Sequence, residues 1–144
     1  MKPIPFDPTA DAAPIPFTRP HLERARDMKA LGLAWHPHVG CFVWDPDQHI
    51  AAASPFPLRV YFILSLPRFM EIFGNTEAMT EKLVWVPTWH QARQMAARLG
   101  IGPEAVAGLW SAPPAPGDEL LGLYGLIQAA LAAGAAIRRS GSGV

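Results

Sequence analysis

The stretch LLGLYGLIQAALAAGAAI, residues 120–137, contains eighteen consecutive residues with no charged side chain and a single glutamine. Asp118 can cap a helix just before it, and Arg138 and Arg139 follow it directly, which predicts one long helix over residues 118–139. A helix that is apolar nearly all round must be shielded from water. The fold therefore has to provide a cover for this helix.

Three covers satisfy this requirement: the chain's own core, a protein partner or second copy of the chain, and a lipid bilayer. Eighteen residues lie at the lower limit for a membrane span, and weakly apolar alanine makes up much of the stretch, so a membrane is the least favoured cover. Gly122 and Gly125 predict the close approach of a neighbouring helix. The candidate contacts with a partner or in a homo-oligomer are the large side chains Leu120, Leu123, Tyr124, Ile127 and Leu131.

Proline marks the divisions of the chain before this helix. Six prolines lie within residues 1–20 and the motif PIPF occurs twice, which predicts an extended, Pro-rich N-terminal arm over residues 1–19. The Pro-rich stretch at residues 112–117 predicts a stiff linker. The expected order is the arm, a core over residues 20–111, the linker, a C-terminal helix packed on the core or on a partner, and a flexible tail over residues 140–144.

Helical and strand patterns alternate irregularly between the arm and the linker. Apolar residues at helical spacing follow Thr18 and stop at Gly32, while Thr88 and Gln91 form a capping box for a helix that stops at Gly100. Strands are predicted over residues 39–44, 49–53, 59–64 and 83–87. This pattern predicts an α+β fold, with a small mixed or antiparallel sheet of three to four strands packed by helices.

The order of these strands follows from two further features. Asp-Pro-Asp-Gln at residues 45–48 is typical of a turn, so the first two strands are expected to form a hairpin with Trp44 opposite His49. The segment RVYFIL, residues 59–64, is apolar without interruption after Arg59 and is expected at the centre of the sheet.

Three of the five histidines, the only cysteine and two aspartates lie within residues 36–49. His36 and His38 share one face of an extended segment and form the candidate pair for a divalent metal ion. Cys41 has the opposite parity and faces away, unless the glycine before it carries a bulge. In the expected hairpin, His49 lies roughly 20 Å along the strand from His38. The group in the sequence is therefore not predicted to be a cluster in space.

A second candidate site lies in the first turns of the predicted helix over residues 89–99. The exposed N–H groups and the dipole of a helix N-terminus favour a bound anion, so His90, Gln91 and Arg93 are the candidate anion-binding residues. His90 could also join His36 and His38 in one metal site if the fold brings them together.

The composition excludes several classes of function. Twelve acidic and twelve basic residues cancel, so no nucleic-acid partner is predicted. The sequence contains none of the common nucleotide-binding, zinc-binding or acyl-transfer motifs. Proline interrupts the N-terminus before any apolar signal segment can form, and one cysteine is compatible with a reducing compartment, so a cytoplasmic location is expected.

These observations favour a non-catalytic cytoplasmic accessory protein of bacterial type that self-associates or docks a protein partner through its last helix. The alternative is a small metal- or anion-binding domain, or an enzyme, that uses His36, His38, His90 and Arg93. No cofactor is predicted for the favoured hypothesis, and a divalent metal at His36 and His38 belongs to the alternative.

Overall fold

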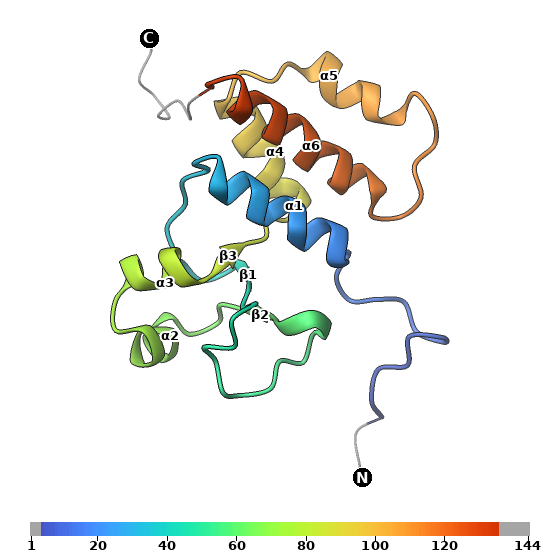
Figure 1. The fold of residues 1–144 in the computed structure, drawn as a ribbon. Coiled ribbons are helices and arrows are strands. Elements are labelled where there is room, and N and C mark those ends of the chain that lie inside the picture. Colours follow the sequence, from blue (N-terminus) through green and yellow to red (C-terminus); the bar gives the residue numbers. More distant parts are fainter. Residues whose placement is uncertain (1–3, 136–144) are drawn as a thin grey trace.

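A computed structural model describes residues 4–135, and within this range the fold is α+β, as predicted (Figure 1). The α-helices are α1 (Arg19–Ala30), α2 (Leu66–Phe73), α3 (Thr76–Lys82), α4 (Trp89–Arg98), α5 (Pro103–Ala107) and α6 (Asp118–Ala132). The strands are β1 (Phe42–Trp44), β2 (Val60–Phe62) and β3 (Val84–Trp85), and the 3₁₀ turns are η1 (Pro57–Arg59) and η2 (Gly108–Trp110). None of these helices is long and apolar enough to cross a membrane.

The three strands form one antiparallel sheet in the order β2-β1-β3. Val43 of β1 lies opposite Tyr61 on one side and Trp85 on the other. The short strand β1 is therefore central, and the prediction that residues 59–64 occupy the centre is wrong. An apolar run does not by itself identify a central strand, because Phe62 lies at the sheet edge with its side chain exposed.

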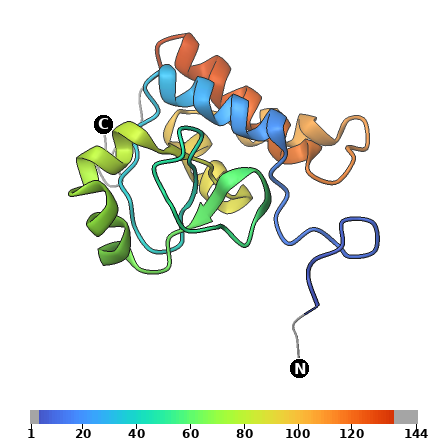
Figure 2. The same cartoon turned by 60° about the horizontal axis from the view of Figure 1, so that its bottom comes forward.

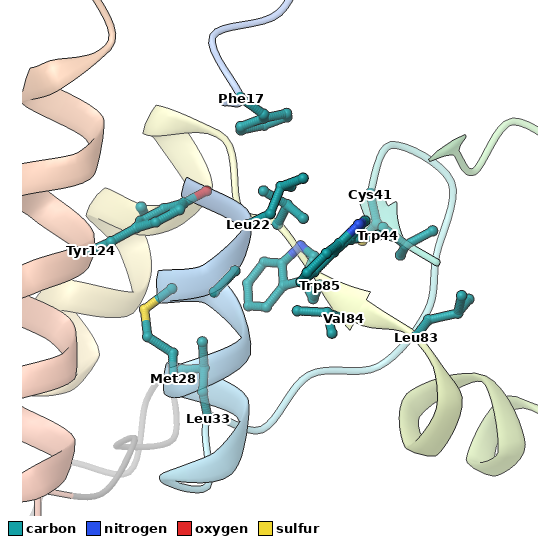
Figure 3. Packing of buried hydrophobic residues seen from close by; sticks show 14 of the residues in the cluster. Phe17, Leu22, Met28, Leu33, Cys41, Trp44, Leu83, Val84, Trp85 and Tyr124 are labelled. Carbon is teal, nitrogen blue, oxygen red and sulfur yellow. The ribbon is translucent and has the colours of Figure 1, made fainter. Parts of the chain in front are cut away.

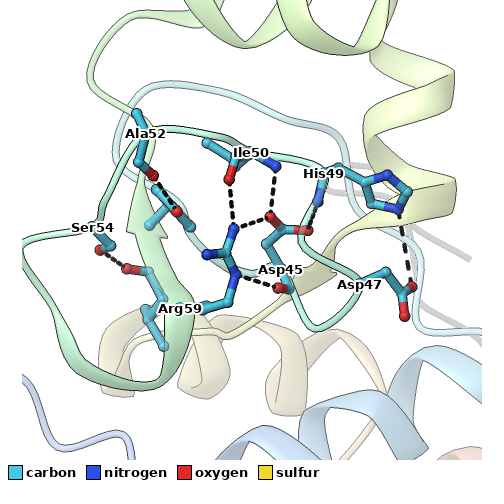
Figure 4. Close-up of polar contacts among 9 residues, drawn as sticks. Asp45, Asp47, His49, Ile50, Ala52, Ser54 and Arg59 are labelled. Atoms are coloured by element: carbon cyan, nitrogen blue, oxygen red, sulfur yellow. Dashed lines mark hydrogen bonds and ion pairs between the residues drawn. The ribbon is translucent and has the colours of Figure 1, made fainter.

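The predicted hairpin between residues 39–44 and 49–53 does not form. Trp44 lies opposite Val60 and not opposite His49, and residues 49–53 form no strand. The sequence between β1 and β2 instead folds into a loop around the carboxylate of Asp45 (Figure 4).

Asp45 is fully buried, and its hydrogen bonds explain the loop. One carboxylate oxygen accepts the backbone N–H of His49 at 3.0 Å, and the other accepts the N–H of Ile50 at 2.8 Å. Arg59 donates to the second oxygen at 2.9 Å and to the Ile50 carbonyl at 2.6 Å. A buried charge has to be paired and hydrogen-bonded. The carboxylate therefore binds the N–H groups that a return strand would need for its ladder.

Helix α6 is covered within the chain. It lies beside α1, the two helices run in the same direction, and it also packs on α4 and η2 (Figures 1 and 2). The small residues allow close approach, as predicted: a Cβ atom on Gly122 would lie 2.9 Å from the side chain of Leu109, and one on Gly125 would lie 3.2 Å from Arg24. A larger residue at either position would therefore have to displace the Leu109 or the Arg24 side chain, which lies against α6.

A buried histidine joins the N-termini of α1 and α6. Nδ1 of His21 accepts the backbone N–H of Thr18 at 3.2 Å, and Nε2 lies 2.8 Å from the carbonyl oxygen of Gly117. Because one nitrogen accepts and the other faces a carbonyl, the ring is the tautomer with its proton on Nε2. The same side chain thus completes the cap of α1 and holds the start of α6 against it.

Helix α6 ends at Ala132, so the predicted end near Arg139 is wrong. Gly134 has a φ of 90°, a conformation that favours glycine, and it donates to the Leu131 carbonyl while Ala135 donates to that of Ala130. This hydrogen-bond pattern closes an α-helix. Residues 136–139 and the predicted flexible tail at 140–144 lie outside the described residues.

The core lies between the α1–α6 pair and the sheet (Figure 3). Leu22 and Met28 of α1, Trp85 of β3 and Tyr124 of α6 meet there. The hydroxyl of Tyr124 donates to the carbonyl of Pro87, which follows β3. Burial raises the pKa of Tyr124 well above its ordinary value of 10.0.

We expect Asp45→Ala to lower the free energy of unfolding by about 3 kcal/mol, because it leaves two backbone N–H groups and the Arg59 guanidinium without their hydrogen-bond acceptor. Asp47→Ala is the matched control. The Asp47 side chain is 73% exposed, and its one ion-pair contact, with His49, is long at 4.0 Å. The substitution should therefore lower the free energy of unfolding by less than about 0.5 kcal/mol. Urea unfolding measures both values. Equal costs would show that the Asp45 network does not stabilise the loop.

We expect the alkaline stability of the protein to depend on Tyr124. Its pKa is higher in the folded chain than in the unfolded one, so its contribution is fully present below pH 10 and is lost as the pH rises further. Tyr124→Phe should therefore lose less stability above pH 10, by up to about 1.4 kcal/mol per pH unit. Urea unfolding of Tyr124→Phe and of the parent chain at pH 8–11 measures this difference. Parallel pH profiles for Tyr124→Phe and the parent would contradict the expectation.

Candidate functional site

A pocket of about 590 Å³ lies between the chain that leaves α1 and one face of α4. Trp85 of β3 also contributes to its wall. The lining residues are Ala34, Trp35, His36, His38, Trp85, Gln91, Gln94, Met95 and Arg98. The volume falls within the range typical of small-molecule sites, roughly 300–1,000 Å³.

Helix α4 supplies the polar side of the pocket. The predicted capping box is confirmed: Thr88 accepts the N–H of Gln91 at 3.2 Å, and the Gln91 side chain accepts that of Thr88 at 3.0 Å. The helix buries Ala92 and Ala96 on its inner side. Its next face, at helical spacing, carries the pocket residues Gln91, Gln94, Met95 and Arg98.

Two tryptophans form the aromatic wall. The rings of Trp35 and Trp85 are nearly parallel, with 15° between their planes and 6.0 Å between their centroids. Trp85 is 6% exposed, and its Nε1 finds no hydrogen-bond partner within residues 4–135. Packing in the core therefore fixes this ring, while the half-buried Trp35 stacks on it from the loop side.

The predicted metal pair lines the same pocket. The rings of His36 and His38 lie 5.2 Å apart, and both residues are exposed. Within residues 4–135, however, no three side chains of the metal-binding types converge on one point. His90 is not among the pocket residues, so the structure does not bring it to this pair. The described residues therefore do not complete a metal site of the type in which three or four ligands converge.

Cys41 lies beside His38, not on the opposite face. Gly40 has a φ of 105° and forms a turn in which Cys41 N–H bonds to the His38 carbonyl, so the alternation of a regular strand is lost. The sulfur lies 3.4 Å from Nδ1 and 3.5 Å from Nε2 of His38. Cys41 is fully buried and burial raises the pKa of its thiol, which disfavours the reactive thiolate.

The structure separates the predicted anion-binding residues of α4. Gln91 faces the pocket, whereas Arg93 extends over the ring of Trp89 at 6.0 Å and His90 is exposed outside the pocket. Thr88 already accepts the first-turn N–H of Gln91. The predicted trio does not form one site, and its Gln91 belongs to the larger pocket.

The predicted partner contacts on α6 all face the interior of the chain. Leu123, Tyr124 and Ile127 are fully buried, and Leu120 and Leu131 are at most 8% exposed. The accessible part of α6 carries small and polar side chains such as Ala129 and Asp118, together with Leu121 and Leu126, which are half-buried. In this structure the five residues pack in the core of the chain.

Sequence reasoning missed six pocket residues: Ala34, Trp35, Trp85, Gln94, Met95 and Arg98. Their grouping depends on a tertiary contact, because the 34–38 segment meets α4 only in the folded chain. A partial signal was present, since Gln91, Gln94 and Arg98 recur at the spacing of one helix face. Comparison of the chain with protein-family models, curated proteins and solved structures gives no match.

We expect Ile127→Ala to lower the free energy of unfolding by about 3 kcal/mol, as for other buried large-to-small changes. If α6 is covered within one chain, the melting temperature of both the variant and the parent should be independent of protein concentration. Calorimetry from 10 to 500 μM measures this. A melting temperature that rises with concentration in the parent would point to an interface between copies.

Proposed function

We propose that this protein binds a small organic molecule in the pocket between residues 34–38 and α4. The observation that carries the proposal is the pocket itself, which combines an aromatic wall from Trp35 and Trp85 with a row of polar side chains on one helix face. Small-molecule sites typically have this composition, with apolar walls that bury the ligand and a few polar groups that orient it.

The unused hydrogen-bonding capacity of α4 supports the proposal. The side chains of Gln94 and Arg98 make no hydrogen bond or ion pair within residues 4–135. Gln91 uses its carbonyl oxygen in the helix cap, which leaves its amide N–H groups for another partner. A ligand in the pocket would give these donors acceptors beside the aromatic wall.

This proposal changes the balance between the two hypotheses from the sequence. The favoured one required an accessible apolar face on the last helix, whereas the five large side chains predicted as partner contacts pack in the chain's own core. The alternative keeps His36 and His38 as pocket residues and loses His90 and Arg93. We therefore propose a ligand-binding role, and we make no assignment of catalysis.

The test is NMR mapping of the full chain with a probe mixture of indole, 2-naphthoate, cyclohexanecarboxylate and inorganic phosphate. At least one probe should shift the Trp35 indole signal and the amides of α4. Gln94→Trp, which fills the pocket from an exposed position, should abolish these shifts. Ala97→Trp places the same ring on the same helix outside the pocket and should preserve them.

Two results would refute the proposal. One is a full set of spectra in which no probe at millimolar concentration shifts the pocket signals. The other is a set of shifts that persists unchanged in Gln94→Trp, because the probe would then bind elsewhere.

A further inference from the structure

We infer that the ligand of this pocket is a small aromatic carboxylate, or an organic anion of the same shape, whose charge lies at Arg98 and whose ring lies against the tryptophans. This inference rests on the proposed function and adds the chemical class of the ligand. It follows from the charge of the lining, the hydrogen-bond donors on α4, the hydrogen bonds of the His38 ring within its own loop, and the aromatic wall.

The first argument is the charge of the lining. Arg98 is the one permanently charged residue among the lining residues, and none of them is aspartate or glutamate. Arg98 makes no ion pair within residues 4–135. A guanidinium at the side of an apolar pocket binds a carboxylate with two parallel hydrogen bonds, and a cationic ligand would meet uncompensated repulsion.

The second argument is the kind of hydrogen-bonding group next to Arg98. Gln94 precedes it by four residues on the same face of α4, and Gln91 precedes it by seven. The carbonyl oxygen of Gln91 accepts the N–H of Thr88, and the two N–H groups of its amide are left to donate to another partner. The α4 side therefore offers donors that complement the oxygen atoms of an anion.

The third argument places the charge at α4 and not at His38. Nδ1 of His38 lies 3.0 Å from the carbonyl of His36, a contact that requires the proton on Nδ1. Nε2 is then an acceptor, and the thiol of Cys41 lies 3.5 Å from it. Both nitrogens of His38 thus have partners inside the loop, and Arg98 remains the cation with none.

The fourth argument concerns the rest of the ligand. The parallel rings of Trp35 and Trp85 present an aromatic wall, and Met95 adds a flexible thioether beside it. Stacking of a flat ring on an indole contributes about 0.5–1.5 kcal/mol beyond the area it buries. A volume of about 590 Å³ admits a molecule with one or two fused rings.

The experiment compares four probes by calorimetric titration of the full chain: 2-naphthoate, the neutral 2-naphthalenemethanol, the cationic 2-naphthylmethylamine, and cyclohexanecarboxylate, which has the charge without the flat ring. We expect 2-naphthoate to bind at least about tenfold more tightly than each of the others, as is typical for one charge-assisted pair or one aromatic stack.

Two arginine variants test which arginine binds the carboxylate of the probe. Arg98→Gln should reduce 2-naphthoate binding to the level of the neutral alcohol and leave binding of the alcohol unchanged. Arg93→Gln removes the same charge from the same helix outside the pocket and should change neither. Both side chains are exposed, so neither variant is expected to disturb folding, and circular dichroism verifies this.

The outcomes separate this inference from the proposed function. If the alcohol or the amine binds as tightly as 2-naphthoate, the ligand is not an anion, although the pocket still binds a small molecule. If cyclohexanecarboxylate matches 2-naphthoate, the aromatic part of the inference fails. If Arg98→Gln and Arg93→Gln weaken 2-naphthoate binding equally, Arg98 does not bind the carboxylate of the ligand. If no probe binds, the proposed function itself fails.

Discussion

The structure depends on the covering of α6, a fifteen-residue helix whose charged side chains are confined to its first turn. Water cannot solvate the large apolar side chains on such a helix without a free-energy cost of about 25 cal/mol for each Å² exposed. The chain meets this constraint internally, with α1 along one side and α4 and η2 against the others. Glycines at positions 122 and 125 let side chains of these neighbours approach α6 closely.

Helix α1 connects α6 to the rest of the molecule through hydrogen bonds at both of its ends. At its first turn, His21 bonds to the carbonyl of Gly117 and fixes the start of α6. Near its last turn, Lys29 donates to the carbonyls of Glu81 and Leu83, at 2.5 and 3.0 Å, and so holds the end of α3 and the approach to β3. Partial burial of the ammonium lowers the pKa of this lysine.

The pocket is a consequence of the same packing. Because α4 uses its alanine face against the core, its neighbouring polar face is left at the surface. The chain that leaves α1 passes this face on its way to β1 and stacks Trp35 on Trp85. Both walls of the pocket are therefore anchored in elements that the burial of α6 and Trp85 holds in place. Pre-organised walls of this kind reduce the entropy that a ligand must lose on binding.

The comparison of sequence and structure separates two kinds of information. Local patterns identified the α+β class, the capping box at Thr88 and Gln91 and the stops at Gly32 and Gly100, because caps and periodicity act within a few residues. They failed between Asp45 and Arg59. The turn residues there predicted a hairpin. The chain instead forms a loop, which is held by the buried Asp45 carboxylate and by Arg59, fourteen residues along the chain.

The sequence by itself determined that α6 must be covered and that α4 would carry polar residues on one face, since both follow from side-chain type and helical spacing. Only the tertiary structure decided what covers α6, which strand is central and which residues share a pocket. Each of these depends on contacts between segments far apart along the chain, such as His21 with Gly117 and Trp35 with Trp85. Their energy is gained only when the whole core assembles, so no short stretch of sequence encodes them.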